Sequence, residues 1–411
     1  MESIFLRCAG LDVHKQSVEA CVRRIEPNGH AYQQTRHWGT MTADILMMAD
    51  WMAAQGVTHV AMESTGVFWK PIFNILEPRF KVLLVNARHL KQVPGRKSDI
   101  RDCQWIAQLL QYGLLKGSFI PPRFQRDLRD LTRHRTQLVE DKTRTSNRIE
   151  KVLEDANIKL GSVASEVMGV SGRAMIEALI EGKKDPAQIA DLARRQLRGK
   201  IPQLEKALQG HLSAHHRFLL EFLWKQLRQQ ELFIAEVEAK IEELTKPFAA
   251  QIERLDAIPG VDRRVAEVIL AEVGPDMTHF PTHRHVAAWA GMCPGNEESA
   301  GKRRKRRITP GNRWLKRTLV QAGWAASHSK NSYLASQYRR LVGRRGKKRA
   351  LVAVAHSILV IAYQLLKNGT SYRDLGSDFF DRLEPERLKR FYLKRLQQLG
   401  HKVILEPCEA A

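Results

Sequence analysis

The hydrophobic pattern of the chain changes at the Pro121-Pro122 pair, and this change limits the folds open to its 411 residues. Before the pair, short apolar runs of strand length alternate with helical stretches, as is typical of an α/β domain. From Phe124 onward, apolar residues recur at helical spacing over long stretches, and no strands are expected. The sequence therefore predicts an α/β unit followed by a helical remainder.

The first part is expected to hold a mixed sheet. Residues 4–22 are typical of strand, turn and strand, with the break at 10–15, and further strands are expected at 57–62 and 81–85. Helices are expected at 43–55 and 99–115. Because a hairpin comes first and crossover connections follow, parallel and antiparallel neighbours should share one sheet.

The middle of the chain shows the spacing of a coiled-coil seam. Apolar residues there recur at alternating steps of three and four, with Gln230 as an interruption. Residues 124–152 fit the same register less regularly, so an antiparallel helical pair or a dimerising arm is expected. A helix packed within its own domain fits the pattern about as well. The seam consists of Leu220, Leu223, Leu227, Ile234, Val237, Ile241, Leu244 and Phe248.

A sharp turn at Ala257–Val261 leads into an apolar helix at 265–273. With Gly260 at the bend and helix N–H groups exposed, the turn resembles half of a helix-hairpin-helix, which grips one phosphate through backbone donors. A plain connection between two helices is the equal alternative. The apolar run 350–366 contains polar residues and falls short of a membrane span, so a core helix is expected. Four parts are predicted: 1–122, 123–250, 251–370 and a tail, 371–411.

The charge of the chain favours a polyanionic partner. Its 67 Lys and Arg residues outnumber 44 Asp and Glu residues, for a formal net charge of +23. An anionic membrane is the competing partner, but the first residues carry no secretory signal. The five cysteines are scattered without a Cys-x-x-Cys pair, which predicts a reducing cytoplasm and no structural zinc.

The charge is concentrated near the C-terminal end, where no Asp or Glu occurs between Glu298 and Asp374. A long basic run is often only a solvated face, but an acid-free stretch of this length is better explained by a phosphate backbone. The candidate nucleic-acid-binding residues are Gly260, Lys302, Arg303, Arg304, Lys305, Arg306, Arg307, Arg313, Lys316 and Arg317.

Four carboxylates in the first part are candidate metal ligands: Asp12, Glu63, Asp99 and Asp102. Asp12 and Glu63 interrupt or end apolar strands, where a charge is avoided unless it points into a site. Asp99 and Asp102 are three residues apart at a helix start and so share a face. Taken singly, Asp99 would more often be a helix N-cap, with Ser98 as the rival, and Glu63 a strand-end charge in a turn. As a set they would place acidic oxygens around one or two Mg²⁺ ions.

Ser299 is a candidate nucleophile because it is expected in a loop of small residues just before the basic run 302–307. Flanking cations and exposed backbone donors would polarise a phosphodiester for attack by a hydroxyl. On local sequence alone, a simple phosphate contact is the more frequent role of such a serine.

These motifs resemble the insertion-sequence-110 family of transposases, which also includes pilin-gene DNA invertases. The N-terminal likeness lies in Gly10-Leu11-Asp12-Val13-His14-Lys15, Met62-Glu63-Ser64-Thr65-Gly66 and Lys97-Ser98-Asp99-Ile100-Arg101-Asp102. The C-terminal likeness lies in Ile258-Pro259-Gly260-Val261, Ala290-Gly291-Met292-Cys293-Pro294-Gly295-Asn296, Glu298-Ser299-Ala300-Gly301-Lys302 and Gly311-Asn312-Arg313-Trp314-Leu315. The resemblance covers roughly residues 8–160 and 250–365.

The resemblance implies a resolvase-like ribonuclease H fold for the first domain, with Asp12, Glu63, Asp99 and Asp102 binding Mg²⁺. It also implies that Ser299 joins covalently to DNA. Because Ala300 stands where some members have a second serine, Ser299 is the only candidate in that loop. Implied partners are donor and target DNA, a structured guide RNA and further copies of the chain in a dimer or tetramer, but no membrane. The implied location is the bacterial cytoplasm, at the nucleoid.

Three other functions remain open at this point. A junction-resolving nuclease would use the carboxylates alone, with water as nucleophile, and a DNA invertase would use the same residues on another target. A non-catalytic nucleic-acid-binding helical protein would require the four carboxylates to be coincidental.

Overall fold

The computed structural model describes residues 3–26, 29–64, 66–86, 90, 101–183, 185–293, 296–299, 302–305 and 310–404, with the backbone alone at 296–299 and 302–305. The chain forms two compact units, Met1–Pro121 and Pro122–Ala411. The finer division predicted for the second unit stays a prediction.

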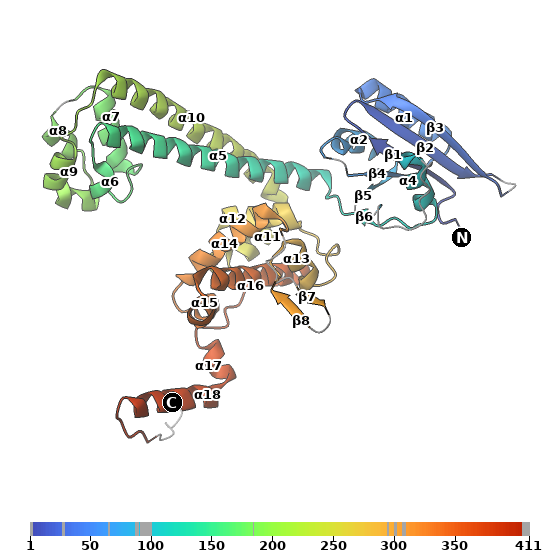
Figure 1. Cartoon of the computed structure of the whole chain (residues 1–411). Coiled ribbons are helices and arrows are strands. Elements are labelled where there is room, and N and C mark those ends of the chain that lie inside the picture. Colours follow the sequence, from blue (N-terminus) through green and yellow to red (C-terminus); the bar gives the residue numbers. More distant parts are fainter. Residues whose placement is uncertain are drawn as a thin grey trace. The chain divides into compact units, whose positions relative to one another are not determined.

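The first unit is built on one mixed sheet of six strands in the order β3-β2-β1-β4-β5-β6 (Figure 1). β2 lies between β1 and β3 and runs antiparallel to both, β4 and β5 run parallel to β1, and β6 returns antiparallel to β5. The predicted mixed sheet is confirmed. The strands are β1 (Arg7–Val13), β2 (Ser17–Ile25), β3 (Ala31–Gly39), β4 (His59–Glu63), β5 (Lys81–Val85) and β6 (Gly117–Ser118).

Helices cover both faces of this sheet. Successive side chains of a strand point to opposite faces, and along β1 the residues Ala9, Leu11 and Val13 pack on one layer. That layer is formed by α1 (Thr42–Ala54) and α2 (Trp69–Leu76). The other face, which includes Cys8, packs on α4 (Asp102–Gln111). The sheet is thus buried on both sides at β1 and β4, the strands that carry the candidate carboxylates.

Two sequence expectations for this unit were wrong in detail. The predicted break at 10–15 is shorter, because β1 continues through Val13 and the turn occupies His14–Gln16. Gly10 belongs to the strand for a packing reason: a Cβ there would lie 2.3 Å from the backbone N of Ala107 and the backbone O of Cys103 in α4. β3 was not predicted, since its mostly polar residues give no apolar alternation.

In the second unit, α5 (Arg123–Asp155) and α10 (Ala214–Thr245) run antiparallel side by side (Figure 1). Phe124 at the start of α5 stacks on Phe248 just after α10, with ring centroids 5.1 Å apart. At the other end, Asp155 pairs with His216 across 2.9 Å. Of the predicted seam, Leu220, Leu227 and Ile241 are fully buried. The coiled-coil interpretation itself stays a prediction.

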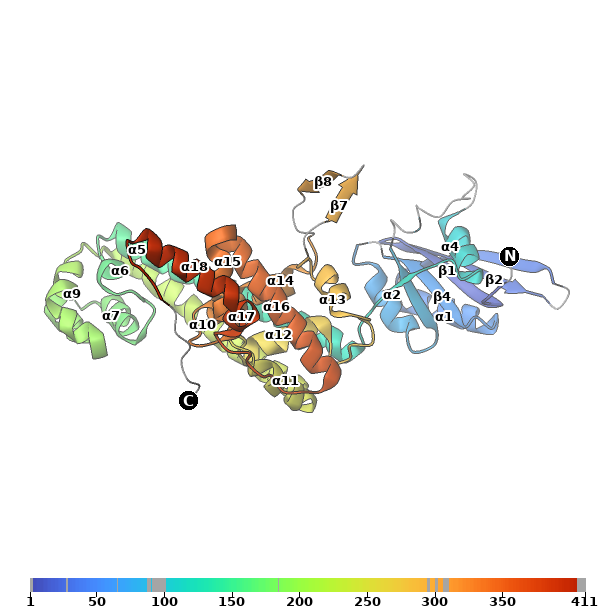
Figure 2. The same cartoon turned by 90° about the horizontal axis from the view of Figure 1, so that it is seen from below.

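The segment 161–210, which showed no chemical signal in the sequence, packs as short helices at the far end of α5 and α10 (Figure 2). Its apolar side chains share one core with Ile149 and Leu153 of α5 and with Leu220 and Leu227 of α10. These short helices therefore bury the apolar side chains at that end of the two long helices. The helices are α6 (Leu160–Val163), α7 (Val170–Ile180), α8 (Pro186–Ala190), η1 (Arg195–Lys200) and α9 (Ile201–Ala207).

The C-terminal part of this unit is a helical core around α16 (Lys347–Asn368). α16 is long and apolar enough to span a membrane by length and composition alone. Its residues Val354, Ile358 and Tyr363 are buried in the core, so the predicted core helix is confirmed. The other elements are η2 (Lys246–Phe248), α11 (Ala249–Asp256), α12 (Arg263–Val273), α13 (His283–Trp289), α14 (Arg313–Ser327), α15 (Tyr333–Arg345), α17 (Phe379–Leu383) and α18 (Pro385–Gln398).

The expectation of a helical remainder without strands was wrong at one place. β7 (Asn296–Ser299) and β8 (Lys302–Lys305) form an antiparallel pair. The register sets Glu297 opposite Arg304 and Glu298 opposite Arg303, residues of opposite charge that favour cross-strand pairing.

Candidate functional site

Two of the candidate carboxylates lie at one edge of the sheet. Asp12 is the next-to-last residue of β1 and Glu63 the last residue of β4. The parallel pairing of these strands joins Leu11 to Met62, so Asp12 and Glu63 each follow directly after the last paired residue. Adjacent parallel strands present their carboxyl ends at the same edge. The backbone therefore brings Asp12 and Glu63 to neighbouring positions.

The third described carboxylate, Asp102, comes from α4, which begins at that residue. The close approach of α4 to β1 at Gly10 sets the position of the helix start. Asp102 lies close enough to Asp12 for its negative charge to contribute to the raised pKa of Asp12. Asp12 and Asp102 therefore face the same region of this unit.

The protonation of Asp12 is set by opposing influences. Burial is the largest and raises the pKa of its carboxyl, and the neighbouring Asp102 raises it further. His14 lowers it in turn, with its Nε2 3.2 Å from Asp12 Oδ2. Burial disfavours the charged form of a carboxyl group. A half-buried carboxylate is therefore typical of a cation-binding or catalytic site.

Glu19 was not predicted as part of the site, but it stands opposite Asp12 in the β1–β2 register. Its Oε1 lies 3.9 Å from Arg101 Nη1, directly before α4. Its Oε2 lies 4.0 Å from Cys103 Sγ. The predicted break at 10–15 concealed this neighbour, because only a turn at 14–16 pairs residue 12 with residue 19.

A complete metal site is not assembled by the described residues. Among them, no three His, Cys, Asp or Glu side chains come together as a ligand set. Asp99, the fourth predicted ligand, lies outside the described residues. What the structure brings together is Asp12, Asp102 and the strand end that carries Glu63, all with the hard oxygen donors that Mg²⁺ prefers.

Ser299, predicted to lie in a loop, is the last residue of β7 and pairs with Lys302 in β8. The serine is thus held at the end of a two-stranded hairpin, because the cross-strand pairing extends to it. Lys302, Arg303, Arg304 and Lys305 make up β8. Arg306 and Arg307, the last two candidates in the basic run, lie outside the described residues.

The other candidate basic residues belong to α14, which follows the hairpin. Arg313 lies with its Cζ 4.8 Å over the ring of Trp314. Arg317, one turn further on, is paired with Glu140 of α5. Lys316 lies between them on the same helix. Arg317 is therefore already engaged with a carboxylate, which a phosphate would have to displace.

Gly260 has a positive φ of 84° in the turn between α11 and α12. A Cβ at this position would lie 2.3 Å from the backbone O of Ala322 and 2.5 Å from the backbone N of Ala326, both in α14. The glycine is thus required by backbone conformation and by packing. Its predicted role in gripping a phosphate stays a prediction.

A buried ionic network fixes α5 to the helices that carry these basic residues. Glu272 of α12 is fully buried and accepts two hydrogen bonds from Arg133 of α5, at 2.7 and 2.8 Å. It accepts a third, at 2.7 Å, from Asn312 Nδ2, the residue that caps α14. The start of α14 is therefore tied to α5 through one carboxylate.

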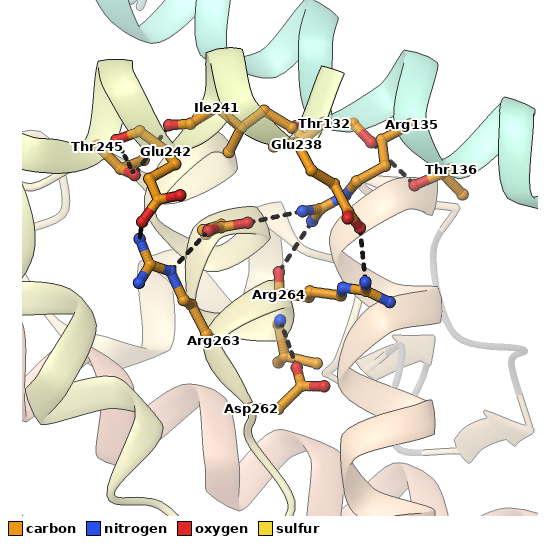
Figure 3. Close-up of polar contacts among 12 residues, drawn as sticks. Thr132, Arg135, Thr136, Glu238, Ile241, Glu242, Thr245, Asp262, Arg263 and Arg264 are labelled. Carbon is orange, nitrogen blue, oxygen red and sulfur yellow. Dashed lines mark hydrogen bonds and ion pairs between the residues drawn. The ribbon is translucent and has the colours of Figure 1, made fainter. Parts of the chain in front are cut away.

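A second group of ion pairs, drawn in Figure 3, joins α12 to α5 and α10. Arg135 of α5 bonds Glu267 of α12 at 2.6 Å, with both side chains more than nine-tenths buried. Arg263 and Arg264 reach across to α10, where they pair with Glu242 at 3.0 Å and Glu238 at 2.7 Å. α12 is therefore connected by charged pairs to both long helices.

Comparison with known proteins identifies the family. Residues 9–158 match a family model described as a transposase, of the DEDD type found in IS110 elements. Residues 252–339 match a second, described as transposase of the IS116/IS110/IS902 family. Together the two models cover more than half of the chain, in the same order as the motifs.

The chain belongs to the IS110 family of transposases. It is 26% identical over 305 residues to an insertion element IS110 protein of 43.6 kDa from Streptomyces coelicolor, over 68% of this chain and 73% of the relative. It is 24% identical over 295 residues to the transposase for insertion sequence element IS1111A of Coxiella burnetii, over 71% and 72%. A putative transposase of Sinorhizobium fredii is 24% identical over 284 residues, covering 67% of this chain and 64% of the relative.

Membership in this family makes the chain a transposase of an insertion sequence, an enzyme class that cuts and rejoins DNA strands. DNA is accordingly its substrate. The DEDD domain further implies a nuclease that depends on a divalent metal ion.

Proposed function

We propose that this transposase exchanges DNA strands through a covalent bond to Ser299, with a divalent-metal site formed by Asp12, Glu63, Asp99 and Asp102. The observation that supports the metal site is geometric: Asp12 and Glu63 follow the last paired residues of β1 and β4, and Asp102 begins α4, which packs closely on β1. Burial raises the pKa of Asp12, and the neighbouring negative charge of Asp102 raises it further. A divalent cation between two such carboxylates would replace their repulsion with attraction.

The donor chemistry of the described residues fits Mg²⁺. Carboxylate oxygens are its usual protein ligands, and the remaining positions are ordinarily filled by water and phosphate. When bound, the ion would offset the negative charge that builds up on a phosphodiester under attack. The chain's own contribution is to place Asp12 at the end of β1, where burial disfavours its charged form and His14, with its Nε2 3.2 Å from Asp12 Oδ2, favours it.

In the proposed reaction the Ser299 hydroxyl attacks a phosphodiester phosphorus and displaces a DNA hydroxyl, which takes up the serine's proton. The product is a serine–DNA phosphodiester that conserves the energy of the broken bond for rejoining. The support for this role is the fixed place of Ser299 at the end of β7, beside the basic strand β8. Fixing the backbone of a nucleophile lowers the entropic cost of attack.

The remaining parts of the proposal concern fold and partners. The strand order, with three antiparallel strands followed by two parallel ones, supports a resolvase-like member of the ribonuclease H fold. A structured guide RNA and an assembly of two or four copies are proposed from the family resemblance. The net charge of +23 is compatible with RNA as well as DNA.

The metal site is tested by strand cleavage of labelled DNA with Mg²⁺ supplied. Asp12→Asn and Asp102→Asn should bind DNA as the wild type does but cleave it at a small fraction of the rate, because each loses a charged ligand. Asp50→Asn, which removes an exposed carboxylate paired with Arg79, should cleave normally. Wild-type cleavage by Asp12→Asn would refute the site.

The runner-up function is a metal-dependent junction-resolving nuclease with water as nucleophile, or a DNA invertase with the same residues. The nuclease would leave free 5′-phosphate ends without a protein adduct. The invertase would share the adduct but act on inverted sites within one DNA molecule.

A further inference from the structure

The chain beyond α16 folds back against the start of α15. Asp374 accepts a hydrogen bond from the backbone N of Tyr333 at 2.9 Å and another from the hydroxyl of Tyr372 at 2.8 Å. Phe380 of α17 stacks on the Tyr333 ring, with centroids 5.4 Å apart and planes 20° from parallel, while Phe379 meets the same ring edge-on. These contacts anchor α17 on α15.

A cleft of about 610 Å³ lies between α15 and the helices α17 and α18. Its charged lining consists of Arg339, Arg340, Arg344, Arg387, Asp381 and Glu384. Glu384 is shared by two of the arginines, at 2.9 Å from Arg387 and 3.8 Å from Arg340. Within the described residues, no ion pair involves Arg339 or Arg344. The cleft thus carries an excess of positive charge.

Aromatic rings line the same cleft. Phe391 and Tyr392 of α18 are 60% and 56% exposed, and their centroids are 5.5 Å apart. The ring of Phe380 also lines it, with Arg340 Cζ 5.2 Å above. No side chain of α18 is buried, so its aromatic residues do not serve the core. Exposed rings between unneutralised arginines are the combination that binds unpaired bases together with their phosphates.

We propose that this cleft binds an unpaired segment of nucleic acid, with bases stacked on Phe391 and Tyr392 and phosphates paired with Arg339 and Arg344. The chemistry is common to single-stranded DNA and RNA. The proposal does not depend on the carboxylates or on Ser299. The rings lie beyond the residues that either family model matches.

A lipid surface is the alternative for a basic helix with exposed apolar residues. The lining of the cleft favours nucleic acid. The rings of α18 share a recess with arginines of a second helix, α15, and do not form one continuous apolar face on a single helix. A recess suits a flexible strand that enters it, whereas a membrane surface contacts the outermost side chains.

The test measures binding by the full chain to labelled oligothymidylate and oligouridylate of about 15 nucleotides, within the range of single-stranded site sizes. A duplex of the same length and vesicles containing anionic phospholipid complete the set. EDTA is present, so a failure of the proposed metal chemistry leaves the result unaffected. The variants are Phe391→Ala with Tyr392→Ala, Arg339→Ala with Arg344→Ala, and the control pair Phe218→Ala with Phe222→Ala, which removes equally exposed rings from α10.

Loss of the two cleft rings should weaken single-strand binding by about tenfold or more and leave duplex binding within about twofold. Loss of the two arginines should weaken single-strand binding and reduce the salt dependence of that binding. The control pair should bind as the wild type does. Comparison of the two homopolymers tells whether DNA or RNA is preferred. Photo-crosslinking with iodouridine should label the peptide that contains Phe391 and Tyr392.

Three results would overturn the proposal. The first is unchanged single-strand binding by the ring variant, together with no crosslink to this peptide. The second is an equal loss for single strand and duplex, which would indicate a general charge effect. The third is vesicle binding that the ring variant loses while oligonucleotide binding persists, which would assign the cleft to lipid.

Discussion

Replacing Glu272 with Gln should destabilise the second unit more than any exposed charge change. The carboxylate is fully buried and is bonded by Arg133 through two hydrogen bonds and by Asn312 through a third. Arg129 Nε lies 3.6 Å away, and burial lowers the pKa of that guanidinium. The amide keeps the shape of the carboxylate but leaves two guanidinium charges without their counter-ion.

The size of the loss follows from the burial of those arginines. Removing one partner of a buried ion pair costs about 3–5 kcal/mol. The lower figure applies here, because the Arg133 side chain is 33% exposed and water can reach part of it. With about 2 °C of melting temperature per kcal/mol in a unit of this size, the midpoint should fall by roughly 6 °C.

Differential scanning calorimetry measures this midpoint for the second unit's transition in the full chain. Glu243→Gln is the matched control, since Glu243 is an exposed partner of Lys240 and its loss should leave the midpoint unchanged. Adding Arg133→Met to Glu272→Gln should recover part of the loss, because it removes one uncompensated charge. Equal midpoints for wild type and Glu272→Gln would refute the account of how α5 is fixed to α12 and α14.

Three further outcomes follow from other parts of the structure. The hydrogen bond from Arg173, with help from Lys142, lowers the pKa of Glu231 to about 2, so Glu231 contributes stability above its unfolded pKa near 4.5 and loses it as pH falls toward 2. The gap in melting temperature between wild type and Glu231→Gln should therefore be full at neutral pH and close across that window; a constant gap would be inconsistent. Gly10→Val should displace α4 and abolish metal-dependent cleavage, whereas Gly199→Ala, with nothing within 4 Å of the added carbon, should cleave normally. Affinity for duplex DNA should fall with salt, log K dropping by about 0.9 per phosphate neutralised, and a flat salt profile would count against the basic surface.

Much of the fold was predictable where hydrophobic periodicity is strong. The strand Lys81–Val85 and the core helix around Val354 and Ile358 follow from apolar runs of matching length. β3 was missed because it pairs with β2 along a polar surface, where no alternation marks it. The hairpin of β7 and β8 was missed because it consists of acidic and basic residues, whose pairing depends on register.

The candidate site was likewise predictable from the sequence only in part. Asp12 and Glu63 were recognisable as charges at the ends of apolar strands, a local property of the sequence. Glu19 was not, since its place opposite Asp12 depends on where the hairpin turns. The ionic network of Glu272 joins residues from α5, α12 and α14 that are far apart in the chain, and no local pattern indicates which of many charges will meet.

The central claim, a covalent Ser299–DNA intermediate, is tested most directly by a denaturing gel of end-labelled DNA incubated with the protein and Mg²⁺. The wild type should yield a protein–DNA adduct that survives denaturation. Ser299→Ala should bind the DNA and yield none, and Ser299→Cys should be inactive or nearly so, because a soft thiolate attacks phosphorus poorly. Changing Ser327, Ser329 or Ser332 to Ala should leave the adduct in place. An adduct that persists in Ser299→Ala would contradict the assignment, and strand cleavage without any adduct would favour water as the nucleophile.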